Sequence, residues 1–154
     1  MVHTIEAYQK IPTTIDKAWE FMSSPKNLKI ICPDYMDFTI TSKESEIQSM
    51  FPGQIITYTL KPLLKIPISW CTEITHVKDK EYFVDEQRFG PYALWHHKHF
   101  LKPIENGVEM YDLVHYKLPM GILGKLANQV FVKKQLQAIF DYRYKKIESL
   151  FGTY

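Results

Sequence analysis

The sequence predicts an α+β fold in which a curved antiparallel sheet wraps around a long final helix. Three observations lead to this fold class. A strand and two short helical segments occupy the chain up to Ile30, strand and turn signals then continue to Leu118, and a long helical pattern follows to Phe151. Wrapping the sheet around the helix buries the apolar faces of both, and a loose fit leaves a cavity between them.

The first three predicted elements are short and well marked. Weak alternation over Val2–Ile11 predicts a strand. Thr13 and Asp16, at the spacing of a capping box, predict the start of a short helix. The pair Ser24-Pro25 predicts a second short helix that ends near Ile30, because proline is favoured at the first helical position.

The middle of the chain carries the pattern of strands. β-branched and aromatic residues, many at period two, predict strands around Phe38–Ile40, Ile55–Leu60, Ile66–Ile74, Phe83–Phe89, Leu94–Leu101 and Val108–Leu118. With the first strand this makes about seven. Gly90-Pro91 is expected to join two of them, and Asn106-Gly107 predicts a tight type I′ turn.

A long helix is predicted from about Leu123 to Phe151, after the breaks at Pro119 and Gly121. Phe131 and Phe140 are expected on the side that faces the sheet. Arg143 on the inner side of the helix would need a partner, and we instead expect it at the edge of the helix, paired with a surface carboxylate. Other apolar residues of the inner side are Leu126, Ala127, Val130, Leu136, Ile139, Ile147 and Leu150.

Composition limits the possible classes of protein. A chain of 154 residues predicts a single domain over residues 1–154. The net charge of +2 gives no reason to expect nucleic acid or an anionic membrane as a partner, and no apolar run is long enough for a membrane span. The N-terminus lacks the pattern of a signal peptide, so Cys32 and Cys71 are expected to be free thiols in a cytoplasmic protein.

Trp95, His97 and His99 are expected to project from one face of a strand, because side chains alternate across a strand. Asp85 on the preceding strand is expected on the same face. An aromatic ring beside two imidazoles indicates a polar spot within a largely apolar wall, as in ligand pockets. His97 and His99 are therefore candidates to orient a ligand or to act as acid or base near neutral pH.

Two other interpretations of this face remain open. In one, Asp85 or Asp112 accepts an imidazole N–H and the group is a satisfied structural network. In the other, His97 and His99 bind a metal together with Asp112 or Asp85. Spacing of two residues on a strand is weak evidence for a metal site, so we predict neither a metal nor a cofactor.

Several stretches, spread over nearly the whole chain, together resemble one superfamily. They are Ala18-Trp19-Glu20-Phe21; Ser24-Pro25-Lys26-Asn27-Leu28; Trp70 with Thr72 and Ile74; Phe83-Val84-Asp85-Glu86-Gln87; Gly90-Pro91-Tyr92; Trp95-His96-His97-Lys98-His99-Phe100; Asp112 to Tyr116; Leu118-Pro119-Met120-Gly121-Ile122-Leu123-Gly124; and Ile139-Phe140-Asp141-Tyr142-Arg143. In this order they resemble the SRPBCC superfamily, which includes START lipid-transfer domains, polyketide cyclases and pollen allergens. Within it the chain is most similar to small bacterial proteins described as cyclase/dehydrase-like.

The resemblance implies the helix-grip fold and a hydrophobic internal cavity. It does not imply one activity, because the superfamily contains carriers, cyclases, hydrolase-like enzymes and regulators. The sequence also leaves the oligomeric state open.

Three functional hypotheses follow. The first is binding of a small hydrophobic ligand, lipid-like or polyketide-like, between the sheet and the long helix. The second is a cyclase or dehydratase that uses His97 or His99 as general acid or base, and the third is a structural or regulatory module with a filled core and no ligand. The expected ligand-binding residues are Tyr58, Trp70, Gln87, Trp95, His97, His99, Asp112, Tyr116 and Phe131.

Overall fold

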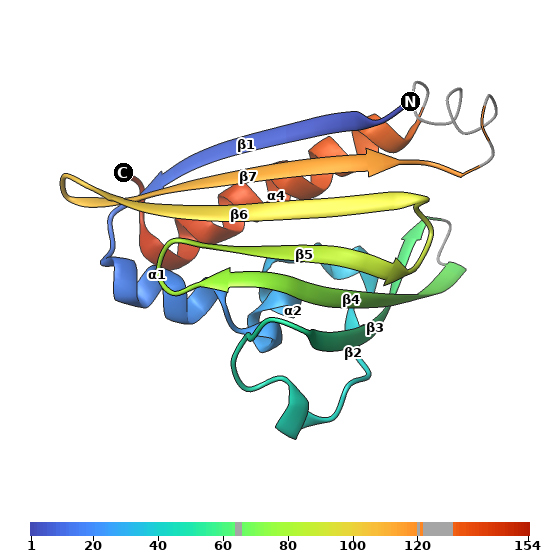
Figure 1. Ribbon diagram of the computed structural model, residues 1–154. Helices are drawn as coiled ribbons and strands as arrows, with labels where there is room; N and C mark the ends of the chain where they lie inside the picture. The colour runs from blue at the N-terminus through green and yellow to red at the C-terminus, as the bar shows by residue number, and fades with distance from the viewer. Residues whose placement is uncertain (64–65, 120, 122–130) are drawn as a thin grey trace.

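The computed structural model describes residues 1–63, 66–119, 121 and 131–154. Its elements follow the expected order (Figure 1). They are β1 (His3–Ile11), α1 (Ile15–Met22), η1 (Pro25–Asn27), α2 (Leu28–Ile31), η2 (Asp34–Met36), β2 (Thr39–Ile40), η3 (Glu44–Glu46), β3 (Gln54–Leu63), β4 (Ile66–Lys78), β5 (Tyr82–Phe89), β6 (Leu94–Ile104), β7 (Gly107–Lys117) and α4 (Lys133–Phe151).

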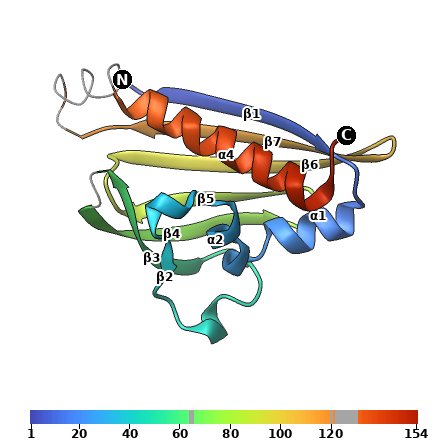
Figure 2. The ribbon, with the colours of Figure 1, turned by 180° about the vertical axis from the view of Figure 1, so that it is seen from behind.

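The described strands form one antiparallel sheet of seven strands in the order β1-β7-β6-β5-β4-β3-β2. Consecutive strands from β2 to β7 are neighbours, and β1 pairs with β7. Figure 2 shows α4 along one face of this sheet, with α1 and α2 on the same face. The predicted α+β class and helix-grip architecture are therefore confirmed.

The most deeply buried packing lies where the start of the chain meets the end of α4. Ile11 of β1, Ala18 of α1 and Val108 of β7 are fully buried there, and Ile147 of α4 is almost so. Burying such side chains stabilises the fold by roughly 1.5–3 kcal/mol each for the larger ones. This cluster fixes the position of α4 against the sheet.

The helix starts differ in detail from the prediction. The cap of α1 is Thr14, not Thr13, and its hydroxyl accepts a hydrogen bond from the Lys17 backbone N–H at 3.4 Å. Ser24 precedes Pro25 as expected, but its side chain makes no capping hydrogen bond and Pro25 begins a short 3₁₀ turn. The predicted start of the long helix at Leu123, and its residues Leu126, Ala127 and Val130, lie outside the described residues.

The β6–β7 turn is displaced by one residue from the prediction. Ile104 pairs with Gly107, so the central residues are Glu105 and Asn106, and the φ angle of Asn106 is 59°. Gly107 has an ordinary φ but lies so close to β1 that a Cβ there would collide with the Ile11 carbonyl oxygen. Glycine is thus required for close approach at this position and not for the turn.

Among the helices that the structure describes, none combines the length and apolar character needed to cross a membrane.

Candidate functional site: a cavity with a buried ionic cluster

A cavity of about 200 Å³ lies between the concave face of the sheet and the helices α2 and α4. Tyr58 and Trp70, two of the expected ligand-binding residues, line its sheet side together with Ile74, and Phe38 lines it just before β2. Phe140 lines it from α4, also as predicted. Most of the lining is apolar, so the cavity favours apolar contents.

Aromatic rings form a continuous wall at one side of the cavity. The Trp70 ring centroid lies 5.9 Å from that of Tyr58 and 5.4 Å from that of Trp95. Tyr92, on the β5–β6 connection, lies 4.9 Å from Trp95. The Trp70 indole N–H donates to the Thr72 hydroxyl at 3.0 Å, so its polar group is satisfied within this wall.

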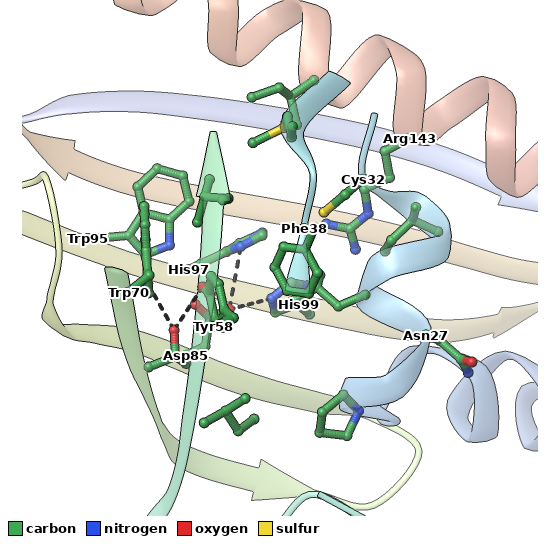
Figure 3. Close-up of a pocket in the computed structure, with 18 of the residues that line it drawn as sticks. Asn27, Cys32, Phe38, Tyr58, Trp70, Asp85, Trp95, His97, His99 and Arg143 are labelled. Carbon is green, nitrogen blue, oxygen red and sulfur yellow. Dashed lines mark hydrogen bonds and ion pairs between the residues drawn. The ribbon is translucent and has the colours of Figure 1, made fainter. Parts of the chain in front are cut away.

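A buried ionic cluster forms another part of the wall. Alternation along β6 places His97 and His99 on the inner face, where Asp85 of β5 lies opposite His97 and Asp112 of β7 lies opposite His99. Arg143 approaches the cluster from α4, and Figure 3 shows it reaching toward the two histidines. The cluster therefore joins three adjacent strands and the helix.

The two histidines make crossed contacts with the two carboxylates. His97 Nε2 lies 3.0 Å from Asp112 Oδ1, and His99 Nε2 lies 2.7 Å from Asp85 Oδ2. Because an ionised carboxylate can only accept, both Nε2 atoms carry the proton in these hydrogen bonds. His99 Nδ1 also lies 2.8 Å from Asp112 Oδ1, but outside hydrogen-bonding orientation, so this contact is electrostatic.

Both carboxylates remain ionised despite burial. Burial alone would raise the pKa of Asp112, but the Arg143 guanidinium and the hydrogen bonds from His97 and His99 hold it well below the ordinary value. Burial likewise opposes ionisation of Asp85, and His97 and His99 lower its pKa. Two buried negative charges therefore need positive partners.

The pKa values of the two histidines shift in opposite directions. Burial lowers the pKa of His97, and the neighbouring positive charge of His99 lowers it further. Burial also acts to lower the pKa of His99, but its contacts with Asp112 and Asp85 outweigh burial and raise it. His99 therefore holds a second proton more strongly than His97 does, and His97 is a neutral imidazole at neutral pH.

Arg143 does not lie where the sequence analysis expects it. It is only 8% exposed, and Nη2 lies 3.5 Å from Asp112 Oδ1. The expected pairing with a surface carboxylate at the helix edge is therefore wrong. Its partner lies 31 positions earlier in the chain, on a strand, which helical spacing alone could not reveal.

The cluster also contains a possible set of metal donors. One atom each from Asp85, His97 and His99 lie within 4.8 Å of one another, which fits a site of two imidazoles and one carboxylate. However, the charge of Arg143 acts on Asp85, and His99 is already held between two carboxylates. A metal would have to displace these ionic contacts.

The structure separates the expected ligand-binding residues into two groups. Tyr58, Trp70, Trp95, His97 and His99 line the cavity. Four others do not: Gln87, Asp112, Tyr116 and Phe131.

Each of these four has a different position. Asp112 and Tyr116 are buried behind the wall, where Asp112 holds the histidines. Gln87 binds the backbone of Tyr92, accepting from its N–H at 3.1 Å and donating to its carbonyl at 2.6 Å. Phe131, expected on the cavity side of the helix, is 40% exposed.

Tyr92 and Cys32 also line the cavity, and neither is among the ligand-binding residues predicted from the sequence. Tyr92 lies on the connection after Gly90-Pro91, and Cys32 ends α2, so neither has a periodic pattern that marks a face. Burial raises the pKa of the Cys32 thiol to about 11, which leaves it neutral. Neither Cys32 nor Cys71 is in a disulfide.

No family model and no curated protein matches the sequence. Solved structures match it over nearly their whole length. TTHA0849 from Thermus thermophilus has 15% identity and a TM-score of 0.71, covering 96% of this chain and 95% of that chain. CV1439 from Chromobacterium violaceum has 9% identity and a TM-score of 0.74, covering 98% of both chains.

Ginseng major latex-like protein 151 from Panax ginseng has 10% identity and a TM-score of 0.69, covering 97% of both chains. At these identities the likeness shows the fold alone. The helix-grip fold implied by the resemblance to the SRPBCC superfamily is thus the fold of this chain.

Proposed function

We propose that the protein binds a small, mainly apolar molecule in the cavity between the sheet and α4. The observation that carries this proposal is an apolar cavity of about 200 Å³ with polar groups concentrated in one part of its wall. Pockets for drug-sized ligands measure roughly 300–1,000 Å³. The ligand is therefore smaller than that class, and apolar burial supplies most of its affinity.

Uptake of N-phenyl-1-naphthylamine, a neutral apolar fluorescent probe, tests this proposal. The wild-type protein is expected to bind the probe with increased fluorescence. Ile56→Trp replaces an aliphatic side chain of the cavity wall by a larger aromatic one, and it is expected to reduce the affinity for the probe at least about tenfold. Ile55, the preceding residue on β3, points outward and is 46% exposed, so Ile55→Trp is the matched control.

Equal binding by both variants would show that the probe binds elsewhere on the protein. No binding by the folded wild-type protein would favour the structural or regulatory module with a filled core. Circular dichroism and thermal unfolding establish that each variant is folded.

A second candidate function is acid–base catalysis in the same cavity. It is supported by one observation, the neutral imidazole of His97 in the cavity wall, because a neutral histidine can accept a proton from a substrate. A cyclase or dehydratase of this kind predicts turnover that His97→Ala abolishes while probe binding remains. Full turnover by the His97→Ala variant would contradict a role of His97 in acid–base catalysis.

A further inference from the structure

Arg143 has hydrogen-bonding capacity that the protein does not use. Its Nε and Nη2 atoms are buried, and no described residue accepts a hydrogen bond from either. The side chain also lines the cavity (Figure 3). A buried, charged donor without an acceptor costs free energy of folding. Two such nitrogen atoms on one side chain are therefore unusual.

Asp112 neutralises the charge of Arg143 without satisfying these donors. Asp112 Oδ1 lies 3.5 Å from Nη2, and the same oxygen accepts from His97 Nε2 at 3.0 Å and contacts His99 Nδ1 at 2.8 Å. One oxygen thus faces three positively polarised groups. His97 is the hydrogen-bond donor to this oxygen, and Arg143 Nε and Nη2 remain without an acceptor among the described residues.

The other titratable groups that the structure describes around the cavity supply no anion to fill this edge. Asp85 is hydrogen-bonded to His99 at 2.7 Å. Burial raises the pKa of the Cys32 thiol to about 11 and raises the pKa of Tyr58 and of Tyr92, so all three are neutral at neutral pH.

Both carboxylates of the cluster have partners before any ligand binds. Asp85 and Asp112 are ionised, and they face the guanidinium of Arg143 and the imidazole of His99, whose pKa is raised. The guanidinium of Arg143 thus has a negative partner in Asp112. Its Nε and Nη2 atoms nevertheless have no hydrogen-bond acceptor among the described residues.

We infer that the ligand carries a carboxylate, or an anionic group of the same shape, which Arg143 binds through Nε and Nη2. These two atoms form one edge of the planar guanidinium, and a carboxylate matches that edge with two parallel hydrogen bonds. The inference rests on the proposed function and names the ligand class: an apolar body with one anionic head. The apolar body would lie against Trp70 and Phe140, which line the same cavity.

His97 adds to this arrangement. It contacts the same Asp112 oxygen as Arg143, so the two side chains are adjacent, and both line the cavity. A carboxylate at Arg143 would favour the protonated form of His97, because an added negative charge stabilises the imidazolium. Anion binding is then expected to be accompanied by proton uptake.

Displacement of N-phenyl-1-naphthylamine by decanoate and by decan-1-ol tests the inference. The two ligands share an apolar chain and differ in the head. The ratio of decanoate to decan-1-ol affinity is expected to fall at least about tenfold in Arg143→Gln. Lys145→Gln removes an exposed charge from the same helix and should leave the ratio unchanged.

Wild-type protein provides a second measurement if Arg143→Gln does not fold. Decanoate is expected to shift the ¹H–¹⁵N resonance of Arg143 Nε, and decan-1-ol is not. Displacement by both ligands, with an unchanged ratio in Arg143→Gln and no selective shift, would overturn the inference while the proposed function stands. Failure of decanoate to displace a bound probe would also overturn it, whereas failure of the probe itself to bind would overturn the proposed function.

Discussion

His97 and His99 are two residues apart on β6, yet their pKa values shift in opposite directions. Burial acts on both in the same sense. The difference arises because His99 lies within 2.8 Å of one oxygen of each carboxylate, whereas the contacts of His97 with Asp112 and Asp85 are longer, at 3.0 and 3.5 Å. The neighbouring imidazole of His99 also lowers the pKa of His97. His99 therefore holds a second proton more strongly than His97 does, and Asp112 is one of the two carboxylates that produce this difference.

Asp112→Asn tests this account of the cluster at neutral pH. It removes the ion pair with Arg143 and leaves a buried positive charge without compensation, which is expected to cost about 3–5 kcal/mol of unfolding free energy. It should also lower the pKa of His99, because a carboxylate contact that raises this pKa is lost. Urea unfolding and NMR titration of the imidazoles measure the two effects.

The pH dependence of this cost has a definite sign. The pKa of Asp112 is lowered from its ordinary value of 3.8, so its contribution is complete above that pH and is lost as the pH falls toward the lower value in the folded state. The cost of Asp112→Asn should therefore shrink in acid. Asp141→Asn, on the exposed side of α4, should cost less than about 0.5 kcal/mol. A cost for Asp112→Asn as small as this control would contradict the account.

Period two along β6 was sufficient to predict that Trp95, His97 and His99 share the inner face, because that property is local. The pairing of Asp112 with both histidines depends on register between strands and remained one of several alternatives in the sequence. Arg143 could not be placed at all from local pattern, since burial of a charged residue depends on a partner far away in the chain.

At the scale of elements, the β5–β6 connection is a part of the cavity wall that is held by side-chain contacts. The amide of Gln87 binds both backbone polar groups of Tyr92, and Tyr92 packs on Trp95 and Trp70. The connection therefore has a fixed shape although Tyr92 lies outside the strands. Gln87 acts on the cavity through Tyr92, without lining it.

Gln87→Ala is expected to destabilise the protein by roughly 1–3 kcal/mol, because it leaves the Tyr92 backbone groups without partners. It should also weaken binding of N-phenyl-1-naphthylamine, since Tyr92 is freed to move. Fluorescence titration and urea unfolding measure these changes. Arg88→Ala, which removes only exposed ion pairs from the next position, should cost no more than about 1 kcal/mol and leave probe affinity unchanged. Unaltered probe binding in Gln87→Ala would show that this connection does not shape the cavity.

Irregular pairing of β5 with β4 explains why inward and outward side chains do not alternate strictly along β5. Asp85 points inward as predicted, but Phe89, which strict alternation from Asp85 would also turn inward, is 67% exposed. The β4–β5 register shifts between Cys71 and Thr72, opposite Phe89 and Gln87. A bulge of this kind changes which side chains face inward, and no residue in the sequence marks its position.

At the scale of the whole molecule, some of the most deeply buried side chains lie away from the cavity. Ile11, Val108 and Ile147 form the most deeply buried contacts between β1, β7 and α4 and do not line the cavity. The fold can therefore be stable while the space beside the aromatic wall remains open.

The order of elements was enough to predict the α+β class and the wrapped sheet, because each element has its own local pattern. The volume of the cavity was not predictable in the same way. It depends on how closely α2 and α4 approach Trp70 and Tyr58, which is a property of packing in three dimensions.

The most direct test of the central claim is the position of a bound apolar molecule. Intermolecular NOEs should connect N-phenyl-1-naphthylamine to ¹³C-labelled methyl groups of Ile56 and Ile74, which line the cavity. The exposed Ile55 and Ile66 serve as internal references on the same sheet and should show none. NOEs to Ile55 or Ile66, without any to Ile56 and Ile74, would place the probe on the surface and contradict binding in the cavity.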